Sequence, residues 1–220
     1  PAVRHLEHGV ARPPVFVVFL PRPQIDGREL PALQRVGRPF GETLLSFLCS
    51  ATKQIVQIKQ MLALLAARHG REILPGVHAL PSWPGLAAIP EADLRACQLG
   101  FRAKFIHETA RFLAADPGWL AATEALPYAA AKERLGSLPG VGEKIADCVL
   151  LFGAGQLEAF PVDVWILKTM AQRYGLTGWK PAHVAQFGRT HFGPLAGFAQ
   201  QFLFAYERTA AGRSNRHGRK

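Results

Sequence analysis

One short stretch, residues 138–146 with the sequence LPGVGEKIA, decides the fold. Pro139 is expected to end one helix, and Gly140 and Gly142 supply the backbone freedom for a tight turn into the next. The amides that open the second helix point outward at the positive end of its dipole, so the turn can hold a phosphate of DNA. A purely structural pair of helices uses the same residues, so the turn alone leaves DNA binding open.

Helical periodicity surrounds this turn on both sides. Apolar residues recur at spacings of three and four from residue 42 onward, which predicts a mostly α fold. The pattern predicts helices at residues 42–49, 54–69, 91–98, 102–115, 143–152 and 163–174, followed by two more toward the C-terminus.

The two ends of the chain differ from this helical part, which we place at residues 40–207 with the helical hairpin at 136–148. Residues 1–39 are rich in proline and glycine and contain one strand-like run at 15–20. Residues 208–220 are basic, small and polar, which predicts a disordered tail that is weakly attracted to DNA.

Composition narrows the class of protein. The chain has 220 residues, of which 49% are hydrophobic, so it can bury a core. Its 26 basic and 16 acidic residues give a net charge of +10, which favours a polyanionic partner such as nucleic acid or an anionic membrane surface. No apolar run is long enough to span a bilayer, so we expect a soluble, intracellular protein that needs no membrane partner. Three distant cysteines suggest neither a disulfide framework nor a zinc or iron–sulfur site.

Lys144 and Asp163 are the candidate catalytic residues. Lys144 lies just inside the helix after the turn, and Asp163 follows nineteen positions later, where it is expected to cap another helix. A lysine amine near a helix N-terminus is more readily neutral and can attack a sugar C1′, and a carboxylate can stabilise the resulting cationic sugar. A solvated surface lysine and a simple capping aspartate are the alternative interpretation.

At this point the sequence resembles the helix-hairpin-helix (HhH-GPD) DNA glycosylase superfamily, and more narrowly its 8-oxoguanine DNA glycosylases with AP lyase activity. The resemblance rests on five stretches in family order, at residues 44–50, 99–105, 138–148, 161–164 and 193–200. It implies two packed helical subdomains with a cleft between them.

The resemblance implies a base-excision repair enzyme in which Lys144 is the nucleophile and Asp163 supports the charge that develops on the sugar. Relatives that do not cut the strand lack a lysine here, so excision of 8-oxoguanine or a related oxidised purine should be followed by β-elimination through a Schiff base. An alkylpurine glycosylase of the same fold and a non-catalytic DNA-binding module are the alternatives.

The last helix is expected to build the pocket for the flipped base. Leu195, Phe198, Ala199, Phe202, Leu203 and Tyr206 form an apolar stripe, and Gln200 and Phe204 lie off it, four residues apart. The resemblance implies that Gln200 and Phe204 bind the oxidised purine and that Cys148 stacks on its other face.

The opposite strand should be read near Phe101 and Arg102, which resemble the pair that fills the gap left by the flipped nucleotide. By contrast, the positions where eukaryotic-type relatives use asparagines and an arginine to read the opposite cytosine hold Thr52, Lys53, Gln54 and Gln57, and only Arg102 of that reading set is retained. We therefore predict relaxed discrimination for cytosine opposite the lesion.

The remaining expectations concern the DNA backbone and cofactors. Phosphate contacts are expected at Gly140, Gly142, Lys144, Val164 and Trp165, the last of which replaces a histidine common in longer relatives. The backbone carbonyls of Gly136, Leu138 and Val141 match groups that hold a weak sodium or potassium ion. No cofactor is required. The expected partner is duplex DNA with a damaged base, bound by a monomer in the cytoplasm or nucleoid, or in the nucleus of a eukaryote.

Overall fold

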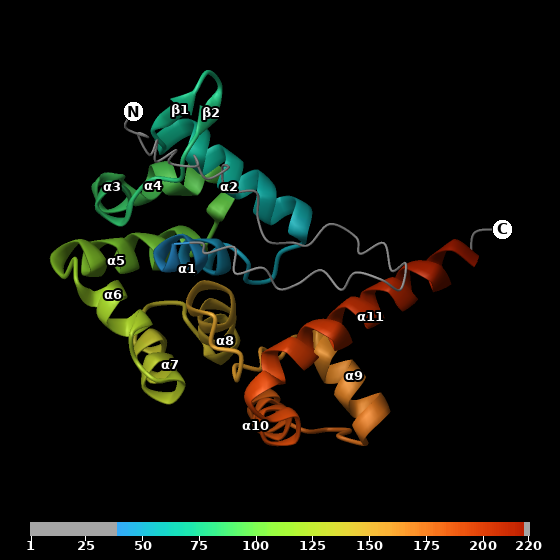
Figure 1. Cartoon of the computed structure of the whole chain (residues 1–220). Helices are drawn as coiled ribbons and strands as arrows, with labels where there is room; N and C mark the ends of the chain where they lie inside the picture. Colours follow the sequence, from blue (N-terminus) through green and yellow to red (C-terminus); the bar gives the residue numbers. More distant parts are fainter. Residues whose placement is uncertain (1–38, 218–220) are drawn as a thin grey trace, which may run out of the picture.

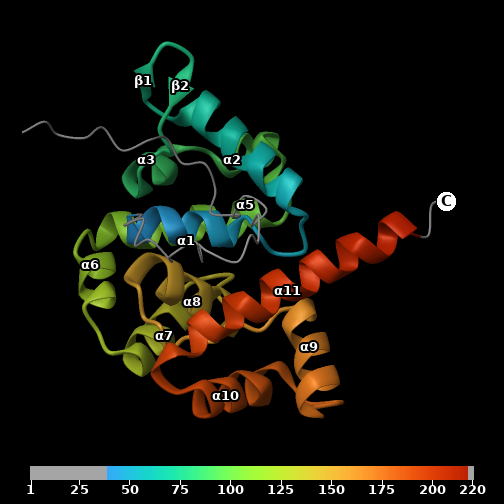
Figure 2. The same cartoon turned by 45° about the vertical axis from the view of Figure 1, so that its right-hand side comes forward.

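The computed structural model describes residues 39–217, with side chains through Glu207. The strand expected at residues 15–20 lies outside the described residues, as does the rest of the N-terminal segment before Pro39. The described chain is mostly helical, as predicted, and its helices gather around two hydrophobic clusters (Figures 1 and 2).

The first cluster lies among the helices of the N-terminal two thirds of the chain (Figure 1). These elements are α1 (Phe40–Leu48), α2 (Ile55–His69), α3 (Trp83–Ala88), α4 (Glu91–Leu94), η1 (Arg95–Leu99), α5 (Arg102–Ala115), α6 (Trp119–Glu124), α7 (Tyr128–Gly136), α8 (Glu143–Val149) and η2 (Leu150–Ala154). The predicted helix at 102–115 is confirmed at both ends, and those predicted at 42–49 and 54–69 begin or end within two residues of α1 and α2.

A small hairpin that was not predicted from the sequence follows α2. Strands β1 (Glu72–Leu74) and β2 (Val77–His78) pair antiparallel. The connecting residues are Pro75 and Gly76, and Gly76 has a φ of +75°, which is the combination that a tight turn of the proline–glycine type requires. The strands are too short to show an alternating pattern, so they leave no periodic signal in the sequence.

Two predicted helices change character toward their ends. The helix expected at 91–98 continues from α4 into η1, where Gln98 adopts a left-handed backbone with a φ of +64°. The helix expected at 143–152 likewise continues from α8 into the wider turn η2, which ends at Gly155. Wider turns of this kind are often found next to functional sites.

The second cluster packs between α9 (Val164–Tyr174), α10 (Pro181–Phe192), η3 (Gly193–Leu195) and α11 (Ala196–His217), which lie together in both views (Figures 1 and 2). The clusters adjoin in the chain, because Ala159 belongs to the first and Phe160 to the second. Gly197 joins them in space: its amide donates to the Leu157 carbonyl at 2.7 Å, and a Cβ there would lie 2.5 Å from Leu151. Only a glycine permits this close approach.

The end of α11 differs from the expected disordered tail. The helix continues to His217, so the boundary drawn at residue 207 falls within a helix and not at its end. A helix already begun adds residues at little cost, and Ala210 and Ala211 favour this extension. Within the described residues, no helix is both long and apolar enough to cross a membrane.

Candidate active site

Lys144 and Cys148 lie one turn apart on α8 and so share a face of that helix. Lys144 is exposed, whereas Cys148 is buried. Burial raises the pKa of the Cys148 thiol to about 12; the positive charge of Lys144 opposes this rise, and the negative charges of Asp147 and Asp163 add to it. The charges of Lys144 and Asp163 therefore both act on this thiol, so the two residues lie near Cys148.

Asp163 is the N-cap of α9, as predicted. Its Oδ1 accepts hydrogen bonds from the amides of Trp165 at 3.0 Å and Ile166 at 2.9 Å. These bonds fix the orientation of the carboxylate. Its other oxygen, Oδ2, makes no hydrogen bond within the described part of the chain, so it is available to a charge that develops beside it.

Gln200 on α11 is brought to the same region by a contact with the turn before Asp163. Its side chain is only 4% exposed, its Nε2 donates to the Pro161 carbonyl at 2.9 Å, and its Oε1 accepts from Gln201 at 2.5 Å. Both polar ends of this amide are thus engaged. Phe204, one turn further along α11, is partly buried against the second cluster.

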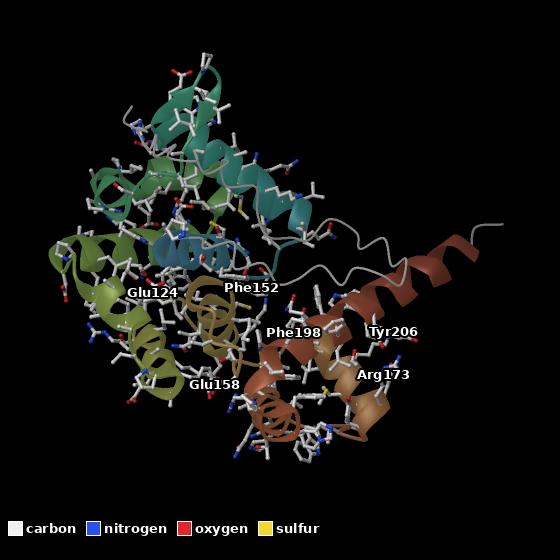
Figure 3. All side chains as sticks on the ribbon, viewed as in Figure 1. Glu124, Phe152, Glu158, Arg173, Phe198 and Tyr206 are labelled. Atoms are coloured by element: carbon white, nitrogen blue, oxygen red, sulfur yellow. The ribbon has the colours of Figure 1, made fainter. Side chains whose placement is uncertain are left out.

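The apolar stripe predicted for α11 is wrong as a description of its buried face. Leu195 precedes α11, and it is exposed together with Phe202 and Tyr206. Ala196 and Leu203 pack in the second cluster, and Gln200 is buried. The close approach of Gly197 to Leu151 and to the Ala159 carbonyl fixes the helix in this orientation. The Tyr206 ring is instead covered by Arg173, whose guanidinium carbon lies 4.5 Å from the ring centre (Figure 3).

Phe101 stands out from the surface, 50% exposed, at the start of α5. The preceding turn holds it there with two positive φ angles, +64° at Gln98 and +58° at Gly100. Its ring meets the edge of Phe105 at 6.1 Å and stacks with the Arg102 guanidinium at 4.3 Å. This is the exposure that a side chain inserted between bases would need.

Arg102 itself is buried, which the sequence did not indicate. Its guanidinium donates to the carbonyls of Leu99 and Ala51 and to the Thr52 hydroxyl, the last at 2.9 Å. Burial lowers its pKa. Arg102 thereby ties the start of α5 to the loop between α1 and α2, where Thr52 adopts a φ of +53°.

Gln57, the other predicted reading residue, is also engaged within the chain. Its Oε1 accepts from the Gln54 amide at 3.2 Å and completes a capping box at the start of α2. The Thr52 hydroxyl and the Gln57 carbonyl oxygen therefore both have hydrogen-bond partners within the chain when no DNA is bound.

The hairpin between α7 and α8 has the tight turn that the sequence predicts, but only one of its glycines is required by geometry. Gly140 has a φ of +77°, and a Cβ there would lie 2.8 Å from the ring of Phe105. Gly142 has an ordinary extended backbone and open space around it, so its freedom is not needed for the turn. The Phe105 ring links this hairpin to the exposed Phe101.

The other predicted contacts to phosphate or cation lie beside this turn. Val164 is exposed and Trp165 partly exposed at the N-terminus of α9. In the hairpin, the Leu138 carbonyl accepts from the Val141 amide at 3.1 Å, and a carbonyl oxygen has a second lone pair for a cation. Within residues 39–207 no cluster of histidine, cysteine and carboxylate side chains forms a metal site.

Comparison with known proteins gives the family. Residues 45–190 match the HhH-GPD superfamily of base excision DNA repair proteins. The chain belongs to this superfamily.

Two curated relatives and one solved structure show which proteins of the superfamily this chain is similar to. It is 40% identical over 116 residues to a probable N-glycosylase/DNA lyase of Methanothermobacter thermautotrophicus, covering 53% of this chain and 37% of the relative. It is 34% identical over 184 residues to the N-glycosylase/DNA lyase OGG1 of Arabidopsis thaliana, covering 76% and 49%. The chain thus spans at most about half the length of these relatives.

The solved structure is the 8-oxoguanine glycosylase/lyase of Clostridium acetobutylicum in complex with double-stranded DNA that contains cytosine opposite 8-oxoguanine. It is 34% identical to this HhH-GPD chain, with a TM-score of 0.75 over 79% of this chain and 61% of that one.

One charged residue of this HhH-GPD chain was missed by the sequence reasoning. Asp147 on α8 is buried three residues after Lys144, within a run of buried residues from Ile145 to Leu150. A carboxylate inside an apolar run was a signal that could have been noticed, because such a group needs a partner. The sequence could not identify that partner, which comes from another helix.

Proposed function

We propose that this chain excises 8-oxoguanine or a related oxidised purine from duplex DNA and then cuts the strand at the abasic site. One observation carries the proposal: Lys144 is exposed in the first turn of α8, directly after the hairpin turn, and the Asp163 carboxylate is fixed at the start of α9, with the charges of both acting on the buried Cys148. The names of the relatives support the same chemistry and the same lesion.

In this mechanism the Lys144 amine attacks C1′ of the damaged nucleotide, and the base leaves with the electrons of the glycosidic bond. Opening of the sugar ring yields a Schiff base, whose protonated carbon–nitrogen double bond acidifies the neighbouring C2′ hydrogen. Loss of that proton expels the 3′ phosphate by β-elimination. Oδ2 of Asp163 stabilises the positive charge that develops on the sugar, since Oδ1 is already held by the α9 amides.

The flipped base is proposed to lie between Cys148 and Phe204, with Gln200 at its edge. The raised pKa of Cys148 keeps its thiol neutral near neutral pH, which suits a stacking surface without charge. Both polar ends of the Gln200 side chain already make hydrogen bonds, so an incoming base would replace the Gln201 amide as the donor to Oε1 of Gln200. Its bond to the Pro161 carbonyl would keep the side chain in place.

The DNA surface is proposed to combine the hairpin, the N-terminus of α9 and the exposed Phe101. Amides around Gly140 and Gly142 and the amide of Val164 would meet phosphates, with the Trp165 side chain beside them. Phe101 would enter the duplex gap beside the stacked Arg102. A sodium or potassium ion on the carbonyls of Gly136, Leu138 and Val141 would add positive charge beside a phosphate. We propose a monomer that acts on DNA within the cell, with residues 40–207 as its glycosylase part.

Discrimination against bases other than cytosine is proposed to be weak. Thr52 and Gln57 lie at positions that read the opposite cytosine in relatives. The Thr52 side chain is short and its hydroxyl accepts from Arg102, and the Gln57 side chain accepts from the Gln54 amide. Arg102 is held by three oxygen acceptors and by its own stack on Phe101, so it is better placed to support the turn than to select a base.

The experiment is incubation of the full chain with duplexes that carry 8-oxoguanine opposite each of the four bases, analysed without alkali. We expect strand cleavage in all four duplexes, at rates within roughly tenfold of one another, because the chain lacks the bidentate base contact that would discriminate by about 1–3 kcal/mol. An undamaged duplex and one with an alkylated purine serve as controls. Cleavage opposite cytosine alone would remove the relaxed-reading proposal. Release of alkylated purine without strand cleavage would favour the alternative glycosylase, and binding with no base release would leave a DNA-binding module.

A further inference from the structure

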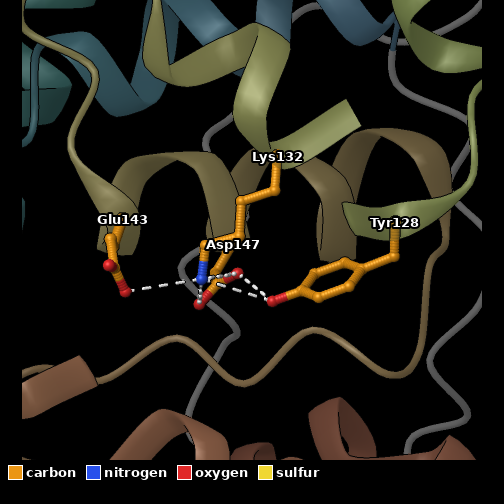
Figure 4. Close-up of polar contacts among 4 residues, drawn as sticks. All are labelled: Tyr128, Lys132, Glu143 and Asp147. Atoms are coloured by element: carbon orange, nitrogen blue, oxygen red, sulfur yellow. Dashed lines mark hydrogen bonds and ion pairs between the residues drawn. The ribbon is translucent and has the colours of Figure 1, made fainter. Parts of the chain in front are cut away.

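Four polar side chains of α7 and α8 form a connected network beside Lys144 (Figure 4). The Tyr128 hydroxyl donates to Oδ1 of Asp147 at 2.6 Å, and the Lys132 amine lies 3.1 Å from Oδ1 and 3.2 Å from Oδ2. The same amine reaches Oε2 of Glu143 at 3.5 Å. Asp147 is 1% exposed and Lys132 is 17% exposed, so this ion pair is largely removed from water.

The network matters because of where its two carboxylates lie on α8. Glu143 immediately precedes Lys144, and Asp147 follows it by three residues, a spacing at which helix side chains of opposite charge commonly pair. Such a pair would hold Lys144 as an ammonium. Instead, Lys144 makes no ion pair within the described residues, because Lys132 and Tyr128 take both oxygens of Asp147 from the α7 side.

Other charged groups near this network do not replace Lys132. Arg189 on α10 lies with its guanidinium carbon 5.5 Å from the Tyr128 ring, and Glu158 acts on Tyr128 from the loop before α9. Asp147 also acts on Cys148, the next residue of α8, because the charges of Asp147 and Asp163 both raise the pKa of the Cys148 thiol. Among residues 39–207, Lys132 is the one cation that forms an ion pair with Asp147.

We propose that Lys132 is a positioning residue that neutralises Asp147 and Glu143 and thereby keeps the Lys144 amine unpaired and reactive. The inference rests on the proposed function of Lys144. It concerns a different step, namely how α8 can carry two carboxylates beside a lysine that must lose its proton before it attacks.

Loss of the Lys132 charge would leave a buried carboxylate with only the Tyr128 hydroxyl as partner. A buried charge without a compensating cation is costly, and the nearest remaining lysine along α8 is Lys144. An ion pair between the Lys144 ammonium and Asp147 would then compete with the attack on the sugar, which needs the neutral amine.

The test uses the full chain and a duplex with a preformed abasic site, so that base excision is bypassed. The measured quantity is the rate at which the borohydride-trapped covalent adduct forms in a single turnover, from mildly acid to mildly alkaline pH. For Lys132→Met we expect the midpoint of this profile to move to higher pH. If the midpoint rises by about one pH unit, the rate at neutral pH should fall by roughly tenfold. Lys132→Arg, which keeps the charge, should restore the wild-type midpoint.

Three further variants keep the inference testable if Lys132→Met folds poorly. Asp147→Asn removes the carboxylate and leaves Lys132 charged, so its midpoint should move to lower pH. The double variant that combines Asp147→Asn with Lys132→Met should have a midpoint close to that of the wild type. Arg95→Met, which removes an exposed ion pair with Glu91 on the first cluster, should leave the midpoint unchanged.

The possible failures can be told apart. If the wild type forms no adduct at any pH, the proposed function fails. If the wild type forms the adduct and both Lys132→Met and Asp147→Asn keep its midpoint, the positioning role is overturned while the nucleophile stands. A merely structural role would lower the melting temperature of Lys132→Met and the amount of active protein, but would not move the midpoint.

Discussion

Asp163 illustrates how one side chain can serve folding and chemistry at once. Oδ1 accepts hydrogen bonds from two amides at the start of α9, and in the proposed mechanism Oδ2 stabilises the developing positive charge on the sugar. The capping bonds also prevent the carboxylate from turning away. The two roles use different oxygens, so they can be separated by substitution.

Asp163→Asn should keep the cap and lose the charge. Asparagine caps helices about as well as aspartate, so we expect a change in the free energy of unfolding below about 0.5 kcal/mol, but a fall in the excision rate on the order of 10²-fold. Asp163→Ala should lose the same activity and, in addition, about 1 kcal/mol of stability. Thermal unfolding and single-turnover excision check both variants. An Asp163→Asn protein that is fully active would show that the carboxylate serves only α9.

Individual residues of the site differ in how far the sequence could predict them. Lys144 and Asp163 were found because each lies at a helix start that its neighbours mark with proline or glycine. The engagement of Gln200 with Pro161, and of Asp147 with Lys132, could not be found, because each joins helices that are distant in sequence. Burial of a polar side chain is set by tertiary packing and not by local spacing.

Among the elements, the turn between α7 and α8 is the one most constrained by geometry. Gly140 needs a left-handed backbone and also has the Phe105 ring where a Cβ would lie. The Phe105 ring in turn packs against Phe101. The hairpin and the exposed aromatic side chain are therefore fixed relative to each other through one residue of α5.

Gly140→Ala should destabilise the protein by roughly 1–2 kcal/mol from the backbone alone, with an added cost for displacing Phe105. Gly136→Ala is the matched control, since a Cβ at the end of α7 meets nothing within 4 Å and alanine favours a helix by up to about 1 kcal/mol. Chemical denaturation of both variants measures the difference. Equal stability of the two would contradict the geometry described for the turn.

Long elements were predicted well and short or irregular ones were not. The fourteen residues of α5 repeat their apolar positions over several turns, which gives a strong periodic signal. The strands β1 and β2 and the turns η1 and η2 are each five residues or fewer, too short for any periodicity to show. Part of the apolar stripe predicted near α11 is exposed, because the orientation of the helix depends on the contact of Gly197 with residues distant in sequence.

At the scale of the whole molecule, the site lies where two hydrophobic clusters adjoin. Lys144 and Cys148 lie on α8, which packs in the first cluster, whereas Asp163 caps α9 and Gln200 lies on α11, which both pack in the second. Figure 2 shows these three helices. The close approach at Gly197 holds α11 against residues 157–159. The relative placement of Lys144 and Asp163 thus depends on packing between the clusters.

The net charge of +10 leads to a prediction about binding. If the protein binds DNA mainly through phosphates, the logarithm of its affinity should fall linearly with the logarithm of the salt concentration. For about six phosphate contacts, raising salt from about 50 to about 200 mM should weaken binding by roughly 10³-fold. Fluorescence anisotropy with a labelled duplex measures this slope. An affinity that does not change with salt would argue against a phosphate-dominated surface.

Borohydride trapping on a duplex with 8-oxoguanine tests the central claim most directly. The wild type, Lys144→Gln and Lys168→Gln are compared, Lys168 being an exposed lysine on α9 that carries the same charge. We expect a covalent protein–DNA adduct for the wild type and for Lys168→Gln, and none for Lys144→Gln. An adduct that persists in Lys144→Gln, or a wild type that releases the base without ever forming one, would contradict the assignment of Lys144 as the nucleophile.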